Sequence, residues 1–598
     1  MQLSNGVILG NTDLARKLQE EAVSLARPGR SALDLARHIY NEAGYLFETC
    51  KHQAAIDKYE EAFDLLRRAR SRISDKHLRD HIMEQYRPGY HRLARLHMAK
   101  GAHGAALGVL EEMAAVGLNE FMAHPPPVAM SSIHTDGEFI GEFPLPPLDE
   151  KALWSTLAEP VPTVAVRYAF VEDDLCAFLA LPNHPIGDWV VCTLEGFGYL
   201  ELAEWFLPPP KPPDALGGGW FGPLHDFRGA MKGHVVSPGT PKDEFVLLMR
   251  QRLIDAWEPM LADLGSKLFA PIVSHLRRSG VGRLLFVPVG VLAHVPLHAM
   301  QWQEGNRSIT VIDEFEVHYA PSLRVFMLSA QRPVPCPART LVIADPTDDL
   351  PLARAEGRMV SRMLPSCQLL EGSNATFEEV RRLAHACTLL HCATHASYDA
   401  TSADLCGICL STGADSEKAE ASASATSSDS VVASPAGADY HLATVPQIFG
   451  NLAVAPGALV VLSACDSGVT LPDFRGEDFV SLSAAFLVAG ASGVICSQWP
   501  VGDMTAALFM LLLYSGLGSK DAAAALAAAQ RRLRSISAED ACRVWNSYGR
   551  DMPGWEQMTT AKLEDVMGFH FENTERPFAC AYFWASFGLW GRAHPPAA

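Results

Sequence analysis

Hydrophobic residues recur with two different periods along this chain, and the change of period separates a helical region from a region of alternating strands and helices. From residue 10 to about residue 120 the chain carries the three-to-four-residue spacing of amphipathic helices and no strand-like runs. From residue 283 onward, short apolar runs such as TLVIADP, TLLHCATH and ALVVLSACD alternate with helical stretches. Uninterrupted apolar strands separated by helices are typical of a parallel sheet covered on both faces. The pattern therefore predicts a multidomain α + α/β protein, with a helical domain followed by a mostly parallel sheet.

Two parts of the helical region share one spacing of small and large residues. In the first part these positions are Ala43, Leu46, Ala55, Tyr59 and Ala62. In the second part they are Ala94, Gly101, Ala106, Leu110 and Met113. Small residues let paired helices approach closely and large ones fill the space between them, which resembles tetratricopeptide repeats. The interval exceeds the usual spacing of about 34 residues, which predicts a longer helix pair or an insertion. A plain helical bundle is the alternative.

Composition places the domain boundaries. Residues 1–123 form the helical domain, and the Pro-rich residues 124–158 are predicted to be a linker. Residues 159–330 mix strands, loops and one long helix, whereas residues 331–595 carry the regular alternation of strands and helices. Within this last part, the Ser/Ala-rich residues 411–439 lack an apolar period and are predicted to be a disordered insert.

Charge and cysteine content narrow the class of protein. The net charge of −19 over 598 residues argues against nucleic acid or an anionic membrane surface as the main partner. No stretch of 18 uncharged apolar residues occurs, and the first residues lack the pattern of a secretory signal. An odd count of 13 scattered cysteines is typical of reduced thiols. We therefore expect a soluble cytoplasmic protein that binds neither membrane nor nucleic acid directly.

Two apolar strands end on residues that can perform nucleophilic chemistry. His395 follows the run LLHCAT, and Cys465 follows the run LVVLSA. Parallel sheets place their ligands and chemistry at the carboxyl ends of strands. An imidazole can take the proton of a nearby thiol, which is otherwise mostly protonated at neutral pH, and later give it to a leaving amine. The pattern predicts a cysteine–histidine dyad, although a packed thiol and a hydrogen-bonded histidine also fit such positions.

A structural zinc site is a second interpretation of the same region. His391 and His395 lie four residues apart, and Cys406 and Cys409 three apart, spacings that closed zinc sites use. However, LCGICL is an apolar run that predicts a strand, in which the two cysteines would point to opposite faces. We therefore expect no metal and no cofactor.

The chain from about residue 160 to 592 resembles the CHAT domain, a caspase-like peptidase domain of the clan of caspases and separases that often follows tetratricopeptide repeats. No single motif is specific, but the set lies in the order of the family. These motifs are VPVGVLAHVPLHAM, HYAPSLRVF, LVIADP, LLHCATH, LVVLSACDSG, GEDFVSLSAAFLVAGASGVICSQWPVGD, ALAAAQRRLR and PFACAYFWASFGLWG. The resemblance implies a degenerate caspase-like half over residues 159–330 and an active half over residues 331–595.

The resemblance also assigns roles to residues. It implies that His395 and Cys465 are the catalytic pair, and that the backbone N–H groups of Ala396 and Cys465 hold the oxyanion. Most relatives have glycine where this chain has Ala396, so any need for a positive φ there would be strained. Asp345 and Asp466, which lie near strand ends, are candidates to line a substrate pocket for a basic residue, or else to hold loop structure. The insert lies where caspases carry a linker that is cut during maturation.

We therefore expect a cysteine endopeptidase that cleaves one particular protein. The resemblance implies a setting in programmed cell death or anti-phage defence, with a gasdermin-like pore-forming protein as one candidate substrate. It also implies a protein or ribonucleoprotein activator that docks on the repeats. A catalytically silent scaffold, in which the repeats recruit partners, is the alternative from another class.

Overall fold

The computed structural model describes most of the chain. The described residues are 32–70, 76–114, 148–158, 160–198, 202, 242–333, 339–399, 405–413, 431–433, 439–469, 481–550, 557–567 and 575–592. Within these ranges, no helix combines the length and the apolar run needed to span a bilayer.

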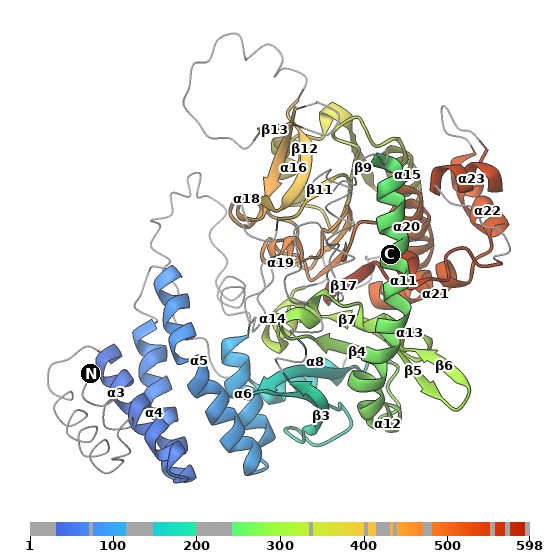
Figure 1. The fold of residues 1–598 in the computed structure, drawn as a ribbon. Helices are drawn as coiled ribbons and strands as arrows, with labels where there is room; N and C mark the ends of the chain where they lie inside the picture. Colours follow the sequence, from blue (N-terminus) through green and yellow to red (C-terminus); the bar gives the residue numbers. More distant parts are fainter. Residues whose placement is uncertain are drawn as a thin grey trace, which may run out of the picture.

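The helical domain consists of antiparallel helix pairs, drawn in blue in Figure 1. Its helices are α3 (Ala32–Glu48), α4 (His52–Arg70), α5 (Lys76–Ala99) and α6 (His103–Met113). Helix α3 packs on α4 and α5 packs on α6, and Ala43, Ala55, Ala94 and Ala106 are fully buried where the helices approach. The described part of this domain therefore contains two helix pairs, as predicted. The long interval between them reflects long inner helices, of 19 residues in α4 and 24 in α5.

The predicted linker contains a helix at its end. Helix α8 (Glu150–Ala158) lies inside the range 124–158, so the linker prediction is wrong for those residues. Its buried Trp154 packs edge-on against Trp189 with ring centroids 4.8 Å apart, and Trp189 Nε1 donates to Glu150 Oε1 at 2.7 Å. The helix forms because apolar residues recur at helical spacing there, after the Pro-rich part has ended. Residues 115–147 lie outside the described ranges.

One sheet of eleven strands runs through the described part of the α/β region, in the order β3-β2-β1-β4-β7-β17-β16-β15-β10-β8-β9. In chain order the strands are β1 (Val164–Val171), β2 (Asp174–Ala180), β3 (Val190–Gly198), β4 (Arg283–Val287), β7 (Glu316–Tyr319), β8 (Thr340–Ala344), β9 (Cys367–Glu371), β10 (Leu389–Ala393), β15 (Leu459–Ser463), β16 (Gly493–Ser497) and β17 (Phe587–Gly591). Most pairs are parallel; β1–β2, β2–β3 and β16–β17 are antiparallel. The sheet is therefore mostly parallel, as predicted.

The two predicted halves of the α/β region share this single sheet. Strand β17, the last described strand of the chain, pairs antiparallel with β16 and parallel with β7. It therefore lies between the strands of residues 159–330 and those of residues 331–595 and joins them. The long-range pairing fuses the two predicted halves into one structural unit.

Helices cover both faces of the sheet beside β10 and β15. Helices α15 (Pro351–Met363) and α20 (Asp503–Leu517) pack on each other and on one face, while α19 (Leu482–Val488) packs against β16. The other helices are α11 (Lys242–Leu264), α12 (Ala270–Arg278), α13 (Val311–Glu314), α14 (Leu323–Ala330), α16 (Phe377–Ala384), α18 (Val445–Asn451), α21 (Ala522–Ser535), α22 (Ala538–Gly549), α23 (Thr560–Met567) and α24 (Ala581–Trp584). A separate hairpin joins β5 (Gln301–Glu304) to β6 (Arg307–Thr310).

A smaller sheet lies beyond the end of β10. Its order is β11 (Ala396–Ser397), β12 (Gly407–Ser411), β14 (Asp439–Thr444) and β13 (Val431–Ala433). Strands β12, β13 and β14 include Ser411, residues 431–433 and Asp439 of the predicted disordered insert, so that prediction is wrong at these positions. The β-branched pair Val431-Val432 favours a strand, unlike the Ser/Ala-rich sequence before it. Residues 414–430 and 434–438 lie outside the described ranges.

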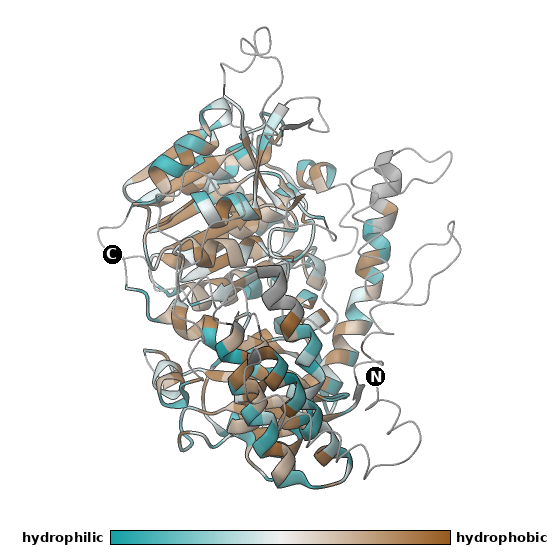
Figure 2. Ribbon diagram, turned by 90° about the vertical axis from the view of Figure 1, so that its left-hand side faces the viewer, coloured by the Kyte–Doolittle hydropathy of each residue, from teal (hydrophilic) through white to brown (hydrophobic). Residues whose placement is uncertain are grey.

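The helical domain and the first strands share one apolar core. The cluster continues from Tyr59, Phe63 and Leu110 in the helices to Phe178 in β2 and Leu285 in β4. Figure 2 shows mostly brown, apolar strands in the centre of the α/β region, while the helices carry both brown and teal residues. Because burial of apolar surface is shared across the boundary, the repeats are docked on the sheet rather than tethered to it.

Candidate active site

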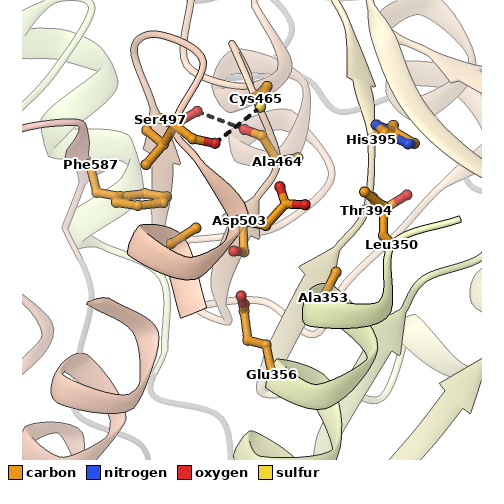
Figure 3. A pocket seen from close by; sticks show the side chains of 13 residues that line it. Leu350, Ala353, Glu356, Thr394, His395, Ala464, Cys465, Ser497, Asp503 and Phe587 are labelled. Carbon is orange, nitrogen blue, oxygen red and sulfur yellow. Dashed lines mark hydrogen bonds between the residues drawn. The ribbon is translucent and has the colours of Figure 1, made fainter. Parts of the chain in front are cut away.

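Adjacent strands deliver His395 and Cys465 to the same edge of the sheet. Strands β10 and β15 pair in parallel, and Ala393 lies opposite Ser463 at their carboxyl ends. Each candidate residue follows two positions later, and both line one pocket (Figure 3). The placement at neighbouring strand ends is as the sequence predicted.

The turn after β15 has a fixed conformation. Asp466 adopts a left-handed φ of 57°, and Gly468 N–H donates to the carbonyl of Ser497 at 2.6 Å. The Ser497 hydroxyl donates back to the carbonyl of Ala464 at 2.6 Å. A β-carbon on Gly468 would lie 2.8 Å from the sulfur of Cys496, so only glycine fits without displacement. These contacts fix the position of Cys465 at the start of the turn.

The two candidate residues do not hydrogen-bond to each other in this structure. The Cys465 thiol donates to the carbonyl of Val501, with Sγ and O 3.7 Å apart. The His395 Nε2 atom lies 3.2 Å from Asp349 Oδ1. Figure 3 shows His395 across the pocket from Cys465, with Asp503 between and below them. The two strand ends place both side chains in the lining of one pocket, but each side chain interacts with another residue.

The surroundings of Cys465 disfavour its thiolate. Burial raises the pKa of the Cys465 thiol to about 12, and the negative charges of Asp503 and Asp466 act in the same direction. Backbone hydrogen bonds at Val501 and Cys465 oppose this rise of the pKa without cancelling it. In this arrangement Cys465 is a neutral thiol at physiological pH.

Asp503 is one acidic residue of the pocket that the sequence interpretation missed. It begins helix α20 and lines the pocket with Cys465 and His395. Burial raises the pKa of Asp503, His395 opposes that shift, and Glu356, Asp349 and other nearby carboxylates add to it. The rule that found the other residues could have found this one, because Asp503 lies six positions after β16, the strand beside β15.

The two aspartates predicted to line the pocket do not do so. Asp345 is buried, and its carboxylate accepts the backbone N–H groups of Asp349 at 3.0 Å and Leu350 at 2.9 Å. It also pairs with Arg354 at 2.6 Å. Asp466 occupies the left-handed turn position after Cys465 and is also buried. The sequence pattern identified acidic residues at strand ends, but it could not show that the Asp345 side chain binds a backbone turn or that neither aspartate lines this pocket.

The backbone N–H group of Ala396 is oriented away from the neighbouring strand. It lies opposite Ile408 in the pairing of β11 with β12, and Cys409 N–H donates to the carbonyl of His395 at 2.9 Å. That bond makes Ala396–Ile408 a non-hydrogen-bonded pair, so the Ala396 N–H points away from β12. Ala396 is not among the described residues with positive φ, and alanine therefore causes no strain there.

A buried polar chain lies beneath the pocket. The Glu356 carboxylate lines the pocket, with Oε1 3.0 Å from His391 Nε2, and the hydroxyl of Tyr514 lies 3.0 Å from His391 Nδ1. Both ring nitrogens of His391 thus lie against other side chains, on the face of β10 that α15 and α20 cover. A zinc site would instead require His391 to lie beside His395, Cys406 and Cys409. Across the described ranges, no three His, Cys, Asp or Glu side chains gather in a metal-binding arrangement.

A family model for the CHAT domain matches residues 258–592, more than half of the chain. This chain belongs to the CHAT domain family. Its fold is thus that of a domain from the caspase-like peptidase clan. Residues 32–114 add the helix pairs that precede the domain.

The relatives are distant. The chain is 28% identical over 319 residues to the human tetratricopeptide repeat protein 28, a match that covers 47% of this chain and 12% of that protein. The chain thus spans about one eighth of the length of this curated relative. Two solved structures of the Saccharomyces cerevisiae separase–securin complex align with it at TM-scores of 0.42 and 0.41 and 10% identity, covering 94% of this chain and 40% of the other.

Proposed function

We propose that this CHAT domain is a cysteine endopeptidase with Cys465 as nucleophile and His395 as base. The observation that carries the proposal is the delivery of both side chains into one pocket by adjacent parallel strands. A thiol and an imidazole at neighbouring strand ends supply the two groups that acyl transfer needs. A movement of the His395 ring or of the Cys465 side chain then brings them into contact.

The reaction follows from these groups. His395 takes the proton of Cys465, and the thiolate attacks the carbonyl carbon of the scissile peptide. The backbone N–H groups of Cys465 and Ala396 stabilise the oxyanion, each donor contributing about 3 kcal/mol. His395 then gives its proton to the departing amine, which leaves an acyl-enzyme. Water, activated by the same imidazole, releases the acid and restores the thiol.

The charge of the pocket supports cleavage after a basic residue. Asp503 and Glu356 line the pocket beside the nucleophile, and the described lining contains no lysine or arginine. A guanidinium or ammonium group that entered would neutralise carboxylates that burial otherwise destabilises. The basic-residue preference proposed from the sequence is thus kept, but with Asp503 and Glu356 in place of Asp345 and Asp466.

The structure resembles a resting state that a partner could switch. The Cys465 thiol is protonated and donates a hydrogen bond to the carbonyl of Val501, and the His395 ring interacts with the carboxylate of Asp349. We propose that an activating protein or ribonucleoprotein binds the helical domain and shifts the population toward a contacting dyad. The core that the helices share with β1, β2 and β4 supports a coupling between binding at the helical domain and the sheet. The proposed setting is cell death or anti-phage defence, with a gasdermin-like protein as a candidate substrate.

Cleavage within residues 411–439 is a separate proposal for activation. Its motivation is the position of this segment between the histidine strand and the cysteine strand. Intact mass of the chain recovered from its host before and after activation tests it. Two fragments separated within this segment are expected, whereas a stable, fully active, uncut chain contradicts the idea.

A catalytically silent scaffold is the second candidate. The lack of a His395–Cys465 hydrogen bond and the raised pKa of the thiol favour it. Such a protein would use the helical domain for recruitment and the caspase-like fold for assembly.

Hydrolysis of fluorogenic peptides distinguishes the two candidates. The parent chain, Cys465→Ala and His395→Ala are compared on peptides with Arg, Lys, Leu or Asp before the reporter, with and without host lysate. Cys580→Ala is the matched control, because Cys580 is also half-buried with a pKa raised to about 12. A peptidase loses hydrolysis in the first two variants and keeps it in the control. Equal rates in all four proteins assign the activity elsewhere and favour the scaffold.

A further inference from the structure

His395 has a carboxylate partner that the sequence interpretation did not include. The His395 Nε2 atom lies 3.2 Å from Asp349 Oδ1, in a loop that precedes α15. A carboxylate can only accept, so the imidazole donates through Nε2. The other ring nitrogen, Nδ1, then carries the lone pair.

The loop that carries Asp349 is held by several interactions. Asp345 has a left-handed φ of 47° and binds the backbone N–H groups of Asp349 and Leu350. The Thr347 hydroxyl donates to Asp349 Oδ1 at 2.5 Å, on the same oxygen that faces His395. Arg354 ties Asp345 to Asp348 from the first turn of α15. A left-handed residue is strained unless its surroundings fix it, and here the strained loop presents one carboxylate to the imidazole.

This contact has two consequences for the dyad. Fixing the proton on Nε2 leaves Nδ1 free to accept the proton of the Cys465 thiol. A negative charge beside the ring then stabilises the imidazolium that forms. Both effects are those of the third member of a nucleophile–base–carboxylate triad.

Other ionisable groups surround this pair. Those near His395 or Asp349 on the neighbouring elements are Asp345, Glu356, Cys409, Cys465 and Asp503. Among these, Asp503 acts on His395 through charge alone, since no hydrogen bond joins them in the described structure. Asp349 is the one that shares a hydrogen bond with the imidazole.

We propose that Asp349 is a positioning residue that completes an Asp349–His395–Cys465 triad. It sets the tautomer of His395 and stabilises the imidazolium, and Thr347 and Asp345 hold it in place. This inference rests on the proposed peptidase function and deepens it.

The test measures the alkylation rate of Cys465 by iodoacetamide as a function of pH. The tagged chain is incubated in lysate of its own host, so that an activating partner is present, and the Cys465 peptide is quantified by mass spectrometry. Loss of the carboxylate in Asp349→Asn disfavours the thiolate–imidazolium pair. We therefore expect the midpoint of the pH profile to rise by at least one unit, with about tenfold slower labelling at pH 6.5.

Two further variants make the result specific. Glu378→Gln removes a negative charge from an exposed ion pair with Arg381 on α16, outside the pocket and the Asp349 loop, and should leave the midpoint unchanged. Asp349→Glu should restore at least part of the shift. Thermal denaturation of each variant reports on folding.

The outcomes separate the two proposals. An unshifted midpoint in Asp349→Asn, or an equal slowing at every pH, overturns the positioning role while the parent chain still hydrolyses peptides. A parent chain that hydrolyses nothing, with Cys465 no more reactive than Cys580, overturns the peptidase and the triad together.

Discussion

Glu111 and Arg167 form a buried ion pair between the helical domain and the sheet. The Arg167 Nε atom donates to Glu111 Oε1 at 2.8 Å, and both side chains are almost fully buried. Glu111 Oε2 also accepts the backbone N–H of Leu323 at 3.0 Å, at the start of α14. One carboxylate of α6 thus holds β1 and α14 together, within the core that the repeats share with the strands.

Removing one partner of this pair should destabilise the protein strongly. Glu111→Gln leaves Arg167 buried without its counter-charge, which typically costs about 3–5 kcal/mol. The free energy of unfolding in urea measures the effect. Glu378→Gln is the control, because its ion pair with Arg381 is exposed and should contribute less than about 1 kcal/mol. Similar losses in both variants would contradict the structural role of the pair.

The charge of Asp503 should destabilise the folded protein at neutral pH. Its pKa is raised above the ordinary value of 3.8, so the folded state favours the protonated form. The contribution of Asp503 to stability is therefore present below about pH 3.8 and is lost as pH rises through the higher folded pKa. Asp503→Asn should consequently raise the melting temperature at pH 7.5 but not at pH 3.5.

The same substitution should remove the preference for a basic residue. Hydrolysis of Arg peptides by Asp503→Asn should fall at least tenfold relative to Leu peptides, since a charged partner for the guanidinium is lost. An unchanged ratio of kcat/KM values for the Arg and Leu peptides would place substrate selection at other residues.

Gly265 should not tolerate a side chain. It begins the π-helical turn Gly265–Phe269 between α11 and α12, and a β-carbon there would lie 1.9 Å from the carbonyl oxygen of Gln301. Gly265→Ala must therefore push β5 away from the turn, and we expect a loss of about 2–4 kcal/mol. Gly108→Ala lies in the middle of α6 with no atom near the new methyl group, and it should stabilise by about 0.5–1 kcal/mol. Urea denaturation of the two variants compares them, and equal effects would refute the close approach.

The sequence predicted the parts of the site that depend on local pattern. His395 and Cys465 were found because an apolar run marks a buried strand and chemistry gathers at strand ends. Asp503 obeys the same rule, but the longer connection after β16 hid it. Asp349 was missed for a different reason, because the left-handed turns at Asp345 and Asp348 decide which aspartate faces the imidazole.

Long-range pairing was also outside the reach of the sequence pattern. The run FGLWG at the end of the chain predicts a strand, but nothing in it shows that β17 inserts between β7 and β16. The helix at Glu150–Ala158 was assigned to a linker because the Pro-rich composition before it dominated the interpretation. Composition describes a segment as a whole, whereas helix formation depends on the spacing of a few apolar residues.

The most direct test of the central claim is covalent labelling of the nucleophile. The chain and its Cys465→Ala variant are treated with a peptidyl chloromethyl ketone that carries arginine next to the warhead, with and without host lysate, and the intact masses are compared. We predict one added label on the parent chain, mapped to Cys465, and none on Cys465→Ala. Labelling that spreads over the other cysteines, or that persists in Cys465→Ala, would contradict the assignment of Cys465 as the nucleophile.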